Sequence, residues 1–302
     1  MRILTWDCHE SLICAWAMLG HEIHLLPYIA EWKWNIQKRP IPDNVKLLPI
    51  GFDMKSKDYD VCVAFNEHTQ LPMARMFGIP YMCSFASLAK IRDQRSLHGE
   101  RLIFCSYSQK KTLGLQGEVV YYPADLDEFN GYRGDNGRIL STINYFGQAC
   151  NKNVKGFDWA YKITKGFGYD NWGWSLDSDT SQFPRPESFA NLKELYRAYA
   201  IYLDPCTASP MSMSNIEAMA TGMPLVTRKH DDWPLIIENG INGVCSDNDN
   251  EIREWMESII KHKDLRERIG ARSRETACEM FSVAAWKKNI NLILEDVCSK
   301  KR

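Results

Sequence analysis

The segment at residues 209–244 constrains the fold more than any other part of the chain, because it predicts a helix, a buried strand and a polar loop that begins another helix. Ser212 or Ser214 is suited to cap the first helix, whose first-turn N–H groups would then meet an anion. The run at 223–227 predicts a short buried strand. Glu217 lies about one turn into the helix, close to the edge of the sheet where α/β proteins bind nucleotides.

Composition is that of an ordinary globular protein with room for two domains. The 302 residues include 45% hydrophobic and 25% charged positions, which is typical of such chains. The length suits two α/β domains. The formal net charge of −1 gives no general attraction to nucleic acid or anionic lipid.

The ten cysteines are scattered and form no Cys-x-x-Cys pair, so neither zinc ligation nor redox chemistry has a sequence signature. Most lie among apolar residues, as reduced thiols do in the cytosol. Asp7, His9 and Glu10 interrupt the first apolar run, which argues against a signal peptide. No apolar run approaches the roughly 18 residues that cross a membrane. We therefore expect a cytoplasmic protein without a transmembrane segment.

Short β-rich runs alternate with helical segments along the chain. Further strands are expected at residues 1–6, 22–26, 45–50, 61–65, 81–85, 102–106, 119–122, 138–143 and 201–203. Further helices are expected at 12–19, 194–199, 251–262, 264–280 and 283–297. Strands spaced by helices imply an α/β fold with parallel sheets covered on both faces.

The segment NGYRGDNG at 130–137 is the best linker in the chain, because Gly and Asn favour turns. We place the domain boundary there, with a first domain over 1–130 and a second over 131–302. Within the second domain, the aromatic-rich stretch at 157–174 is expected to form a distorted strand and loop. Core packing is the expected role of its aromatic side chains.

Residues 216–227, IEAMATGMPLVT, together with PLIIENG at 234–240 and Asn242-Gly243, resemble the donor-site signature of retaining GT-B glycosyltransferases of family four. GHEIH at 20–24 and the segment at 122–129 resemble parts of the first domain of these enzymes. The resemblance implies two Rossmann-like domains facing across a cleft, with the last helix crossing back to the first domain. It also implies that a sugar is transferred from a nucleoside-diphosphate sugar with retention.

The family signature contains two glutamates. Glu217 matches the second, and the resemblance implies that it binds the ribose hydroxyls of the donor. The position of the first, which usually contacts the transferred sugar, is occupied by Ser209. His230 and Asp231, with Asp232 beside them, lie in the turn before the next helix and could bond the sugar hydroxyls instead.

The donor diphosphate is expected to meet the loop that leads into the first helix of the signature. The residues expected to contact the donor through backbone N–H or hydroxyl groups are Ser209, Met211, Ser212, Met213 and Ser214. KGFD at 155–158 resembles the family's Lys-Gly-x-Asp stretch, which implies that Lys155 neutralises the diphosphate. Lys152 is the nearest substitute for an arginine that the family has and this chain lacks. A fixed cation would stabilise the charge that develops on the leaving phosphate.

Two polar clusters follow strands of the first domain and are candidates for the acceptor side. One cluster consists of Asp7, His9 and Glu10; the other contains His68, with Asn66 and Glu67. Either cluster is suited to orient an acceptor hydroxyl or to act as general base.

We therefore expect a glycosyltransferase with a nucleoside-diphosphate sugar as donor substrate and with no metal ion and no cofactor, since lysines and helix N-termini carry out the charge work. The acceptor would be a glycan or a small molecule. Three alternatives remain: a noncatalytic nucleotide-sugar binder, motivated by Ser209; a GT-B epimerase; and a transferase that modifies a modified DNA base, as some viral enzymes do. The near-zero net charge gives the last no support.

Overall fold

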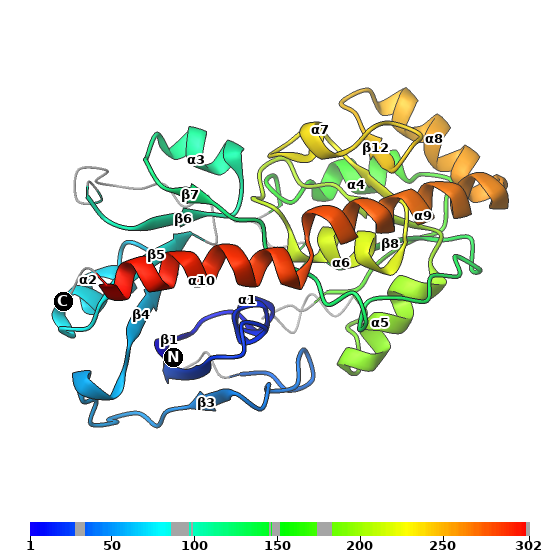
Figure 1. Cartoon of the computed structure of the whole chain (residues 1–302). Coiled ribbons are helices and arrows are strands. Elements are labelled where there is room, and N and C mark those ends of the chain that lie inside the picture. Colours follow the sequence, from blue (N-terminus) through cyan, green and yellow to red (C-terminus); the bar gives the residue numbers. More distant parts are fainter. Residues whose placement is uncertain are drawn as a thin grey trace. The chain divides into compact units, whose positions relative to one another are not determined.

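The computed structural model describes residues 1–27, 34–85, 97, 99–144, 146, 152–173 and 183–299. The chain forms two compact units (Figure 1). Unit 1 contains Met1–Pro123 together with Val283–Arg302, and unit 2 contains Ala124–Ser282. The chain leaves unit 1 once and returns to it with the last helix, α10 (Val283–Ser299). The division at Pro123 precedes the linker segment in which we expected the boundary.

Unit 1 is built on a parallel sheet with the strand order β3-β2-β1-β4-β5-β6-β7. The strands are β1 (Arg2–Asp7), β2 (Glu22–Pro27), β3 (Val45–Leu47), β4 (Val61–Ala64), β5 (Tyr81–Phe85), β6 (Leu102–Phe104) and β7 (Glu118–Val119). The helices are α1 (Glu10–Ala17), α2 (Gln70–Met76), α3 (Tyr107–Leu113) and α10, with a short 3-10 turn η1 (Ser56–Asp58). The central strand β4 is buried along its whole length, as expected of a sheet covered on both faces.

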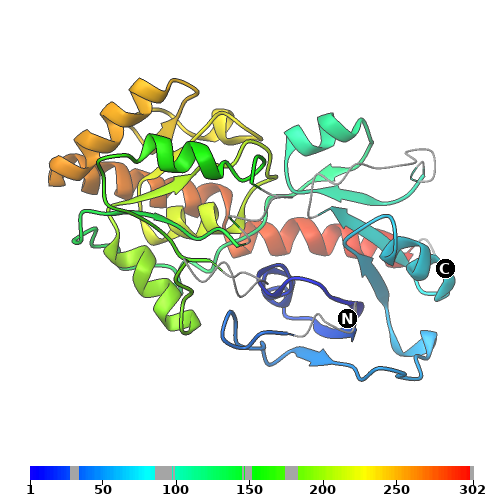
Figure 2. The same ribbon diagram turned by 180° about the vertical axis from the view of Figure 1, so that it is seen from behind.

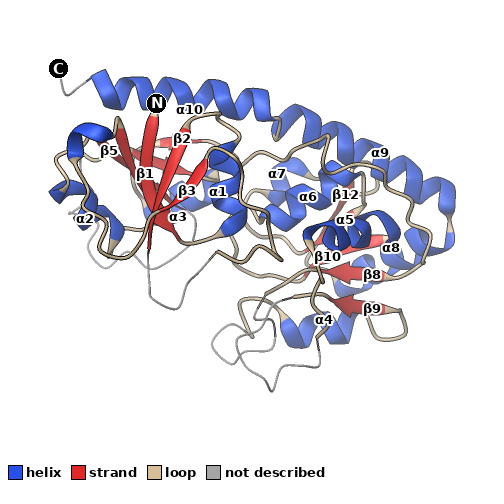
Figure 3. Ribbon diagram, turned by 90° about the horizontal axis from the view of Figure 1, so that it is seen from below, coloured by secondary structure: helices blue, strands red, loops and turns tan. Residues whose placement is uncertain are grey.

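Unit 2 contains a second parallel sheet, with the order β12-β11-β10-β8-β9 (Figure 3). Its strands are β8 (Ile139–Ser141), β9 (Tyr169–Asn171), β10 (Ile201–Asp204), β11 (Leu225–Thr227) and β12 (Gly243–Cys245). Its helices are α4 (Phe157–Ile163), α5 (Phe189–Ala198), α6 (Met213–Thr221), α7 (Trp233–Ile236), α8 (Asp249–Lys261) and α9 (Lys263–Met280). Figure 2 shows both units from behind.

Two glycines allow α6 to pack directly against α9. Gly222 ends α6 with a φ of 93°, a left-handed conformation that favours glycine. A Cβ on Gly270 of α9 would lie 2.2 Å from the Gly222 carbonyl oxygen. The close approach of these two backbones fixes α6, and with it Glu217, against α9.

The expected strands and helices overlap observed elements, although many strands are shorter than expected. The strand expected at 45–50 ends at Leu47, two residues before Pro49, which cannot donate to a ladder. The aromatic stretch at 157–174 was interpreted wrongly. It forms helix α4, with Gly156 at φ 67° as its N-cap, followed by β9. Residue 174 lies outside the described residues.

The helices in the described ranges include none that is both long enough and apolar enough to cross a membrane.

Candidate functional site

Three neighbouring strands of unit 2 end in polar residues at one edge of the sheet. Strands β8, β10 and β11 are adjacent and parallel, so their carboxyl ends meet there. Thr142 directly follows β8, Asp204 ends β10 and Thr227 ends β11. Helix α6 begins after the loop that follows β10. This is the edge at which open α/β sheets bind ligands.

Glu217 is held inside this edge by hydrogen bonds. Only 4% of its surface is exposed, and its neighbours Ile216 and Ala218 are fully buried. The Tyr196 hydroxyl, on α5, donates to Glu217 Oε2 at 3.2 Å. Thr221 Oγ1 donates to the Glu217 carbonyl oxygen at 2.8 Å. Burying a carboxylate is costly unless it is hydrogen-bonded, so Glu217 is a fixed acceptor and not a solvated surface glutamate.

The start of α6 differs from the expected serine cap. Ser212 is the N-cap residue, but neither serine caps the helix, because the Ser212 and Ser214 hydroxyls bond each other at 2.7 Å. The Ser212 carbonyl accepts from the N–H groups of Asn215 and Ile216. Among the residues that the structure describes, no acceptor is recorded for the N–H groups of Met213 and Ser214. The first two N–H groups of α6 therefore stay available to an anion.

The loop before α6 is tied to the loop after β11 through two strained residues. Met211 has a φ of 22° and Asp231 a φ of 48°, and both values are unusual for residues other than glycine. The Met211 N–H donates to Asp231 Oδ2 at 2.5 Å. Met211 is 1% exposed, so its side chain packs in the core. The Met211 N–H, which we expected to face the donor, is already used by Asp231 in this structure.

A buried ion pair lies between the same two loops. Asp204 accepts hydrogen bonds from Asn215 Nδ2 at 2.6 Å, from the Cys206 N–H at 3.0 Å and from His230 Nε2 at 3.0 Å. Burial would raise the pKa of Asp204, but the charge of His230 and these hydrogen bonds lower it to about 2. Burial likewise pulls the pKa of His230 down, and Asp204 outweighs it and raises that pKa above its ordinary value.

His230 is thereby fixed in one orientation. Its side chain is 2% exposed, and Nε2 also lies 3.2 Å from Thr227 Oγ1. Among the residues that the structure describes, Nδ1 has no hydrogen-bond partner of good geometry, although the Ser209 backbone lies close enough to raise the pKa of His230 further. His230 therefore acts on the loop that contains Ser209 and does not present its ring to solvent.

The two lysines come from the turn before α4, which packs against the loop after β10. A Cβ on Gly156 would lie 1.9 Å from the Pro205 carbonyl oxygen, so only glycine allows this approach. Lys155 Nζ donates to the Asn144 carbonyl at 2.8 Å. Lys152 Nζ pairs with Asp158 Oδ1 at 2.8 Å. The turn brings Lys155 to the same edge as Asp204. There its positive charge partly offsets the burial that raises the pKa of the Cys206 thiol. Lys152 is instead paired with Asp158.

The first cluster predicted in unit 1 lies at the carboxyl edge of its sheet. Asp7 ends β1, and burial, reinforced by the charge of Glu10, raises the pKa of Asp7 although the Trp34 backbone lowers it. Glu10 begins α1, and its Oε1 accepts from the Asn35 N–H at 3.2 Å. His9 is exposed at the start of α1 and does not cap it with its side chain.

His68 follows β4, the strand beside β1, so it belongs to the same edge as Asp7. Its Nε2 lies 2.9 Å from Glu67 Oε1, but the geometry is that of an ion-pair contact and not of a hydrogen bond. The structure thus brings the two predicted clusters of unit 1 to one edge of one sheet.

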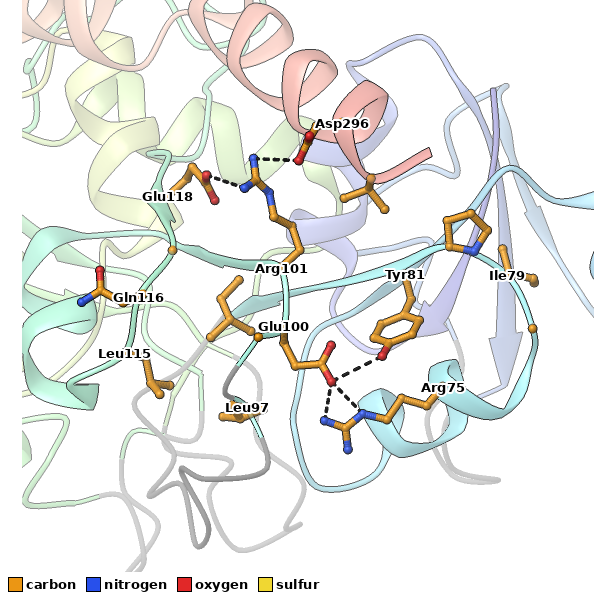
Figure 4. Close-up of a pocket in the computed structure, with 16 residues that line it drawn as sticks. Arg75, Ile79, Tyr81, Leu97, Glu100, Arg101, Leu115, Gln116, Glu118 and Asp296 are labelled. Atoms are coloured by element: carbon orange, nitrogen blue, oxygen red, sulfur yellow. Dashed lines mark hydrogen bonds and ion pairs between the residues drawn. The ribbon is translucent and has the colours of Figure 1, made fainter. Parts of the chain in front are cut away.

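One cavity of the structure lies elsewhere in unit 1. It has a volume of about 700 Å³ and is lined near the start of β5 and β6, at the edge opposite to Asp7. Figure 4 shows two groups of charges on its wall. Glu100 accepts from Arg75 at 2.7 Å, and Arg101 pairs with Glu118 at 2.9 Å and with Asp296 at 3.4 Å. None of the predicted site residues lines this cavity.

Within the described ranges, no group of three or more His, Cys, Asp or Glu side chains is arranged to hold a metal ion.

The segment that contains β10, α6 and β11 matches a known protein family. Residues 178–276 match the model of a family described as glycosyl transferases group 1. Spore coat protein SA of Bacillus subtilis is 27% identical over 120 residues, which are 38% of this chain and 30% of that protein. D-inositol 3-phosphate glycosyltransferase of Corynebacterium kroppenstedtii is 28% identical over 120 residues, 39% of this chain and 26% of that protein. Each match spans less than a third of the relative's length.

Solved structures match nearly the whole chain. HepE of Anabaena, solved with UDP, has a TM-score of 0.74 at 13% identity, over 98% of this chain and 99% of that chain. Sucrose-phosphate synthase from Thermosynechococcus elongatus has a TM-score of 0.75 at 11% identity, over 99% and 100% of the two chains. The protein therefore has the fold of the GT-B glycosyltransferases, and the predicted α/β class with two parallel sheets is confirmed.

Several residues at this edge were not found from the sequence. They are Thr142, Tyr196, Asp204, Asn215 and Thr227. Asp204 had a usable signal, because an Asp-Pro pair directly after a buried strand places a carboxylate at the carboxyl edge of the sheet. Tyr196 had none, since a tyrosine on a helix is normally part of the core.

Proposed function

We propose that the protein is a glycosyltransferase that binds a nucleoside-diphosphate sugar at the carboxyl edge of the unit 2 sheet. One observation carries the proposal. Glu217 is a buried, hydrogen-bonded carboxylate about one turn into α6, inside the segment that matches the group 1 family. HepE was also solved with UDP-glucose, which supports uridine nucleotides as the first ligands to test.

In the proposed complex the ribose hydroxyls donate to Glu217, and the diphosphate lies at the head of α6. The Met213 and Ser214 N–H groups and the positive end of the helix dipole favour a phosphate there. The hydroxyls of Ser212 and Ser214 add two polar groups. Lys155 stands on a turn packed against the same loop and supplies a positive charge.

The sugar would lie beside Ser209, near the loop that follows β10 and the loop that follows β11, which Asp231 and His230 join. When the bond between the sugar and the β-phosphate breaks, its electron pair goes to the phosphate, and Lys155 and the head of α6 stabilise that charge. The acceptor hydroxyl attacks the oxocarbenium-like carbon from the face that the phosphate leaves, which gives retention. The hydroxyl proton passes to the leaving phosphate or to a base. A metal ion is not required in this scheme.

On the acceptor side we propose the carboxyl edge of unit 1. Asp7 is suited to accept a proton because its pKa is raised by burial. His9, Glu10 and His68 lie at the same edge and would orient the acceptor, a glycan or another hydroxyl compound.

Calorimetry with Glu217→Ala tests the donor site. Loss of hydrogen bonds to a charged acceptor should weaken UDP binding about 10- to 100-fold. Glu254→Ala, at an exposed position of α8, is the matched control and should bind as wild type does. Equal UDP affinity in Glu217→Ala and wild type would refute the assignment of Glu217.

A nucleotide-sugar binder without transferase activity is the second candidate. This candidate is favoured because two groups that we expected to bind the donor already have partners within the protein. Lys152 pairs with Asp158, and the Met211 N–H donates to Asp231. Incubation of the protein with UDP-glucose and a panel of acceptor sugars separates the two. Release of UDP that depends on an acceptor establishes the transferase, whereas binding without any release establishes the binder.

A further inference from the structure

A chain of hydroxyl groups leads from the end of β8 to Glu217. The Thr142 N–H donates to Tyr202 Oη at 3.3 Å. Tyr202 Oη lies 2.9 Å from Thr142 Oγ1, which lies 3.1 Å from Tyr196 Oη. The Tyr196 hydroxyl donates to Glu217 Oε2 at 3.2 Å. The residues come from β10, α5 and α6 and from the position after β8.

The direction of this chain follows from the number of protons. A hydroxyl has one proton to donate. Tyr196 gives its proton to Glu217, so it must accept from Thr142 Oγ1. Thr142 Oγ1 then has no proton left and must accept from Tyr202. Every donor in the chain therefore points toward Glu217, and the last acceptor is a carboxylate.

We propose that Tyr196 is a positioning residue for the nucleotide site, held in place by Thr142 and Tyr202, and that it sets the orientation of the Glu217 carboxylate that binds ribose. The proposal rests on the function proposed above. An ionised carboxylate has about four acceptor positions. The bond from Tyr196 takes one of these positions and restrains the rotation of the carboxylate.

The surroundings keep the chain in its donating state. Burial raises the pKa of the Tyr202 hydroxyl, so that group stays protonated. The Tyr196 ring packs against Tyr202 with centroids 5.8 Å apart and against Phe129 at 6.0 Å. These ring contacts do not depend on the hydroxyl. Tyr196→Phe should therefore keep the packing and remove the bonds of the hydroxyl to Glu217 and to Thr142.

The test compares two ligands that differ only at the ribose. The probe is whichever of UDP, GDP and ADP binds the wild-type protein most tightly, together with its 2′,3′-dideoxy form. Tyr196→Phe should weaken the ribonucleotide about 10-fold, because a hydrogen bond to a charged group is lost, and leave the dideoxynucleotide unchanged. Thr142→Val should give a smaller loss with the same dependence on the ribose.

Tyr199→Phe is the matched control, since it also removes a tyrosine hydrogen bond to a half-buried carboxylate of the same unit, that of Asp170. It should bind both nucleotides as wild type does. A Tyr196→Phe protein that loses equal affinity for both ligands, or for neither, overturns the positioning role. A wild-type protein that binds both ligands equally well refutes the ribose role of Glu217 itself, and with it the proposed donor site.

Discussion

The buried pair of His230 and Asp204 makes the free energy of unfolding depend on pH in a defined direction. The pKa of Asp204 falls from 3.8 to about 2 in the folded protein. At about 1.36 kcal/mol per unit this corresponds to about 2 kcal/mol of stability. Because the folded pKa is lowered, that stability is present above about pH 4 and is lost as the pH falls toward 2. The partner shift of His230 describes the same interaction and is not added to it.

The alkaline side has the opposite sign. The pKa of His230 is raised above 6.5 in the folded protein. Its contribution is therefore complete below about pH 6.5 and is lost as the pH rises through the folded value. Asp231 is the other charged group that raises this pKa. Wild-type protein should therefore lose stability from this pair between mildly acidic and alkaline pH.

His230→Gln keeps a side-chain donor but cannot be charged. Urea unfolding followed by fluorescence at about pH 5.5, 7 and 8.5 should show the variant least stable relative to wild type at the lowest of these pH values. The difference should shrink as the pH rises. Parallel pH profiles for the two proteins would refute the ion pair as the source of the stability.

Two further changes act on the turn before α4. Gly156→Ala should destabilise the protein by about 1–3 kcal/mol or more, because Gly156 has a φ of 67° and a Cβ there would lie 1.9 Å from the Pro205 carbonyl oxygen. Thermal unfolding measures this loss, and an unchanged melting temperature would contradict the packing. Lys155→Gln should weaken UDP more than uridine in calorimetry, because only UDP carries the diphosphate, whereas Lys152→Gln should change neither, because Lys152 already pairs with Asp158. Equal effects of the two lysine changes would argue against a separate role for Lys155.

The fold was predictable because its signals are local. Buried runs such as Val61–Ala64 and Leu225–Thr227 are short, apolar and bounded by polar turns, and their spacing by helices leaves little choice but a parallel sheet. Helix α4 was missed because its aromatic residues hide the 3.6-residue period. The glycine that starts it, Gly156, is set by a contact with Pro205 that is distant in sequence.

A site residue was predictable only where the sequence around it marks it as unusual. Glu217 stands out because a charged residue within a small and apolar helix is rare. The partners of Glu217 and His230 were not predictable in the same way, since Tyr196 and Asp204 reach them from other elements of the fold. The prediction that Ser212 or Ser214 caps α6 was wrong, because the hydroxyls of the two serines bond each other and not a backbone N–H group of the helix. The role of each predicted site residue stays a prediction until a ligand is bound.

The return of α10 to unit 1 has a consequence for how the protein is made on the ribosome. Trp286 of α10 donates to the Ala15 carbonyl at 3.2 Å and packs against Trp16 and Tyr122, each with centroids 5.7 Å away. Trp16 and Tyr122 are translated long before Trp286, so this part of the unit 1 core stays open while all of unit 2 is synthesised. Domains usually fold in the order in which they are synthesised, with the N-terminal domain first. Here unit 2 can complete its core before unit 1 does, because unit 1 must wait for α10.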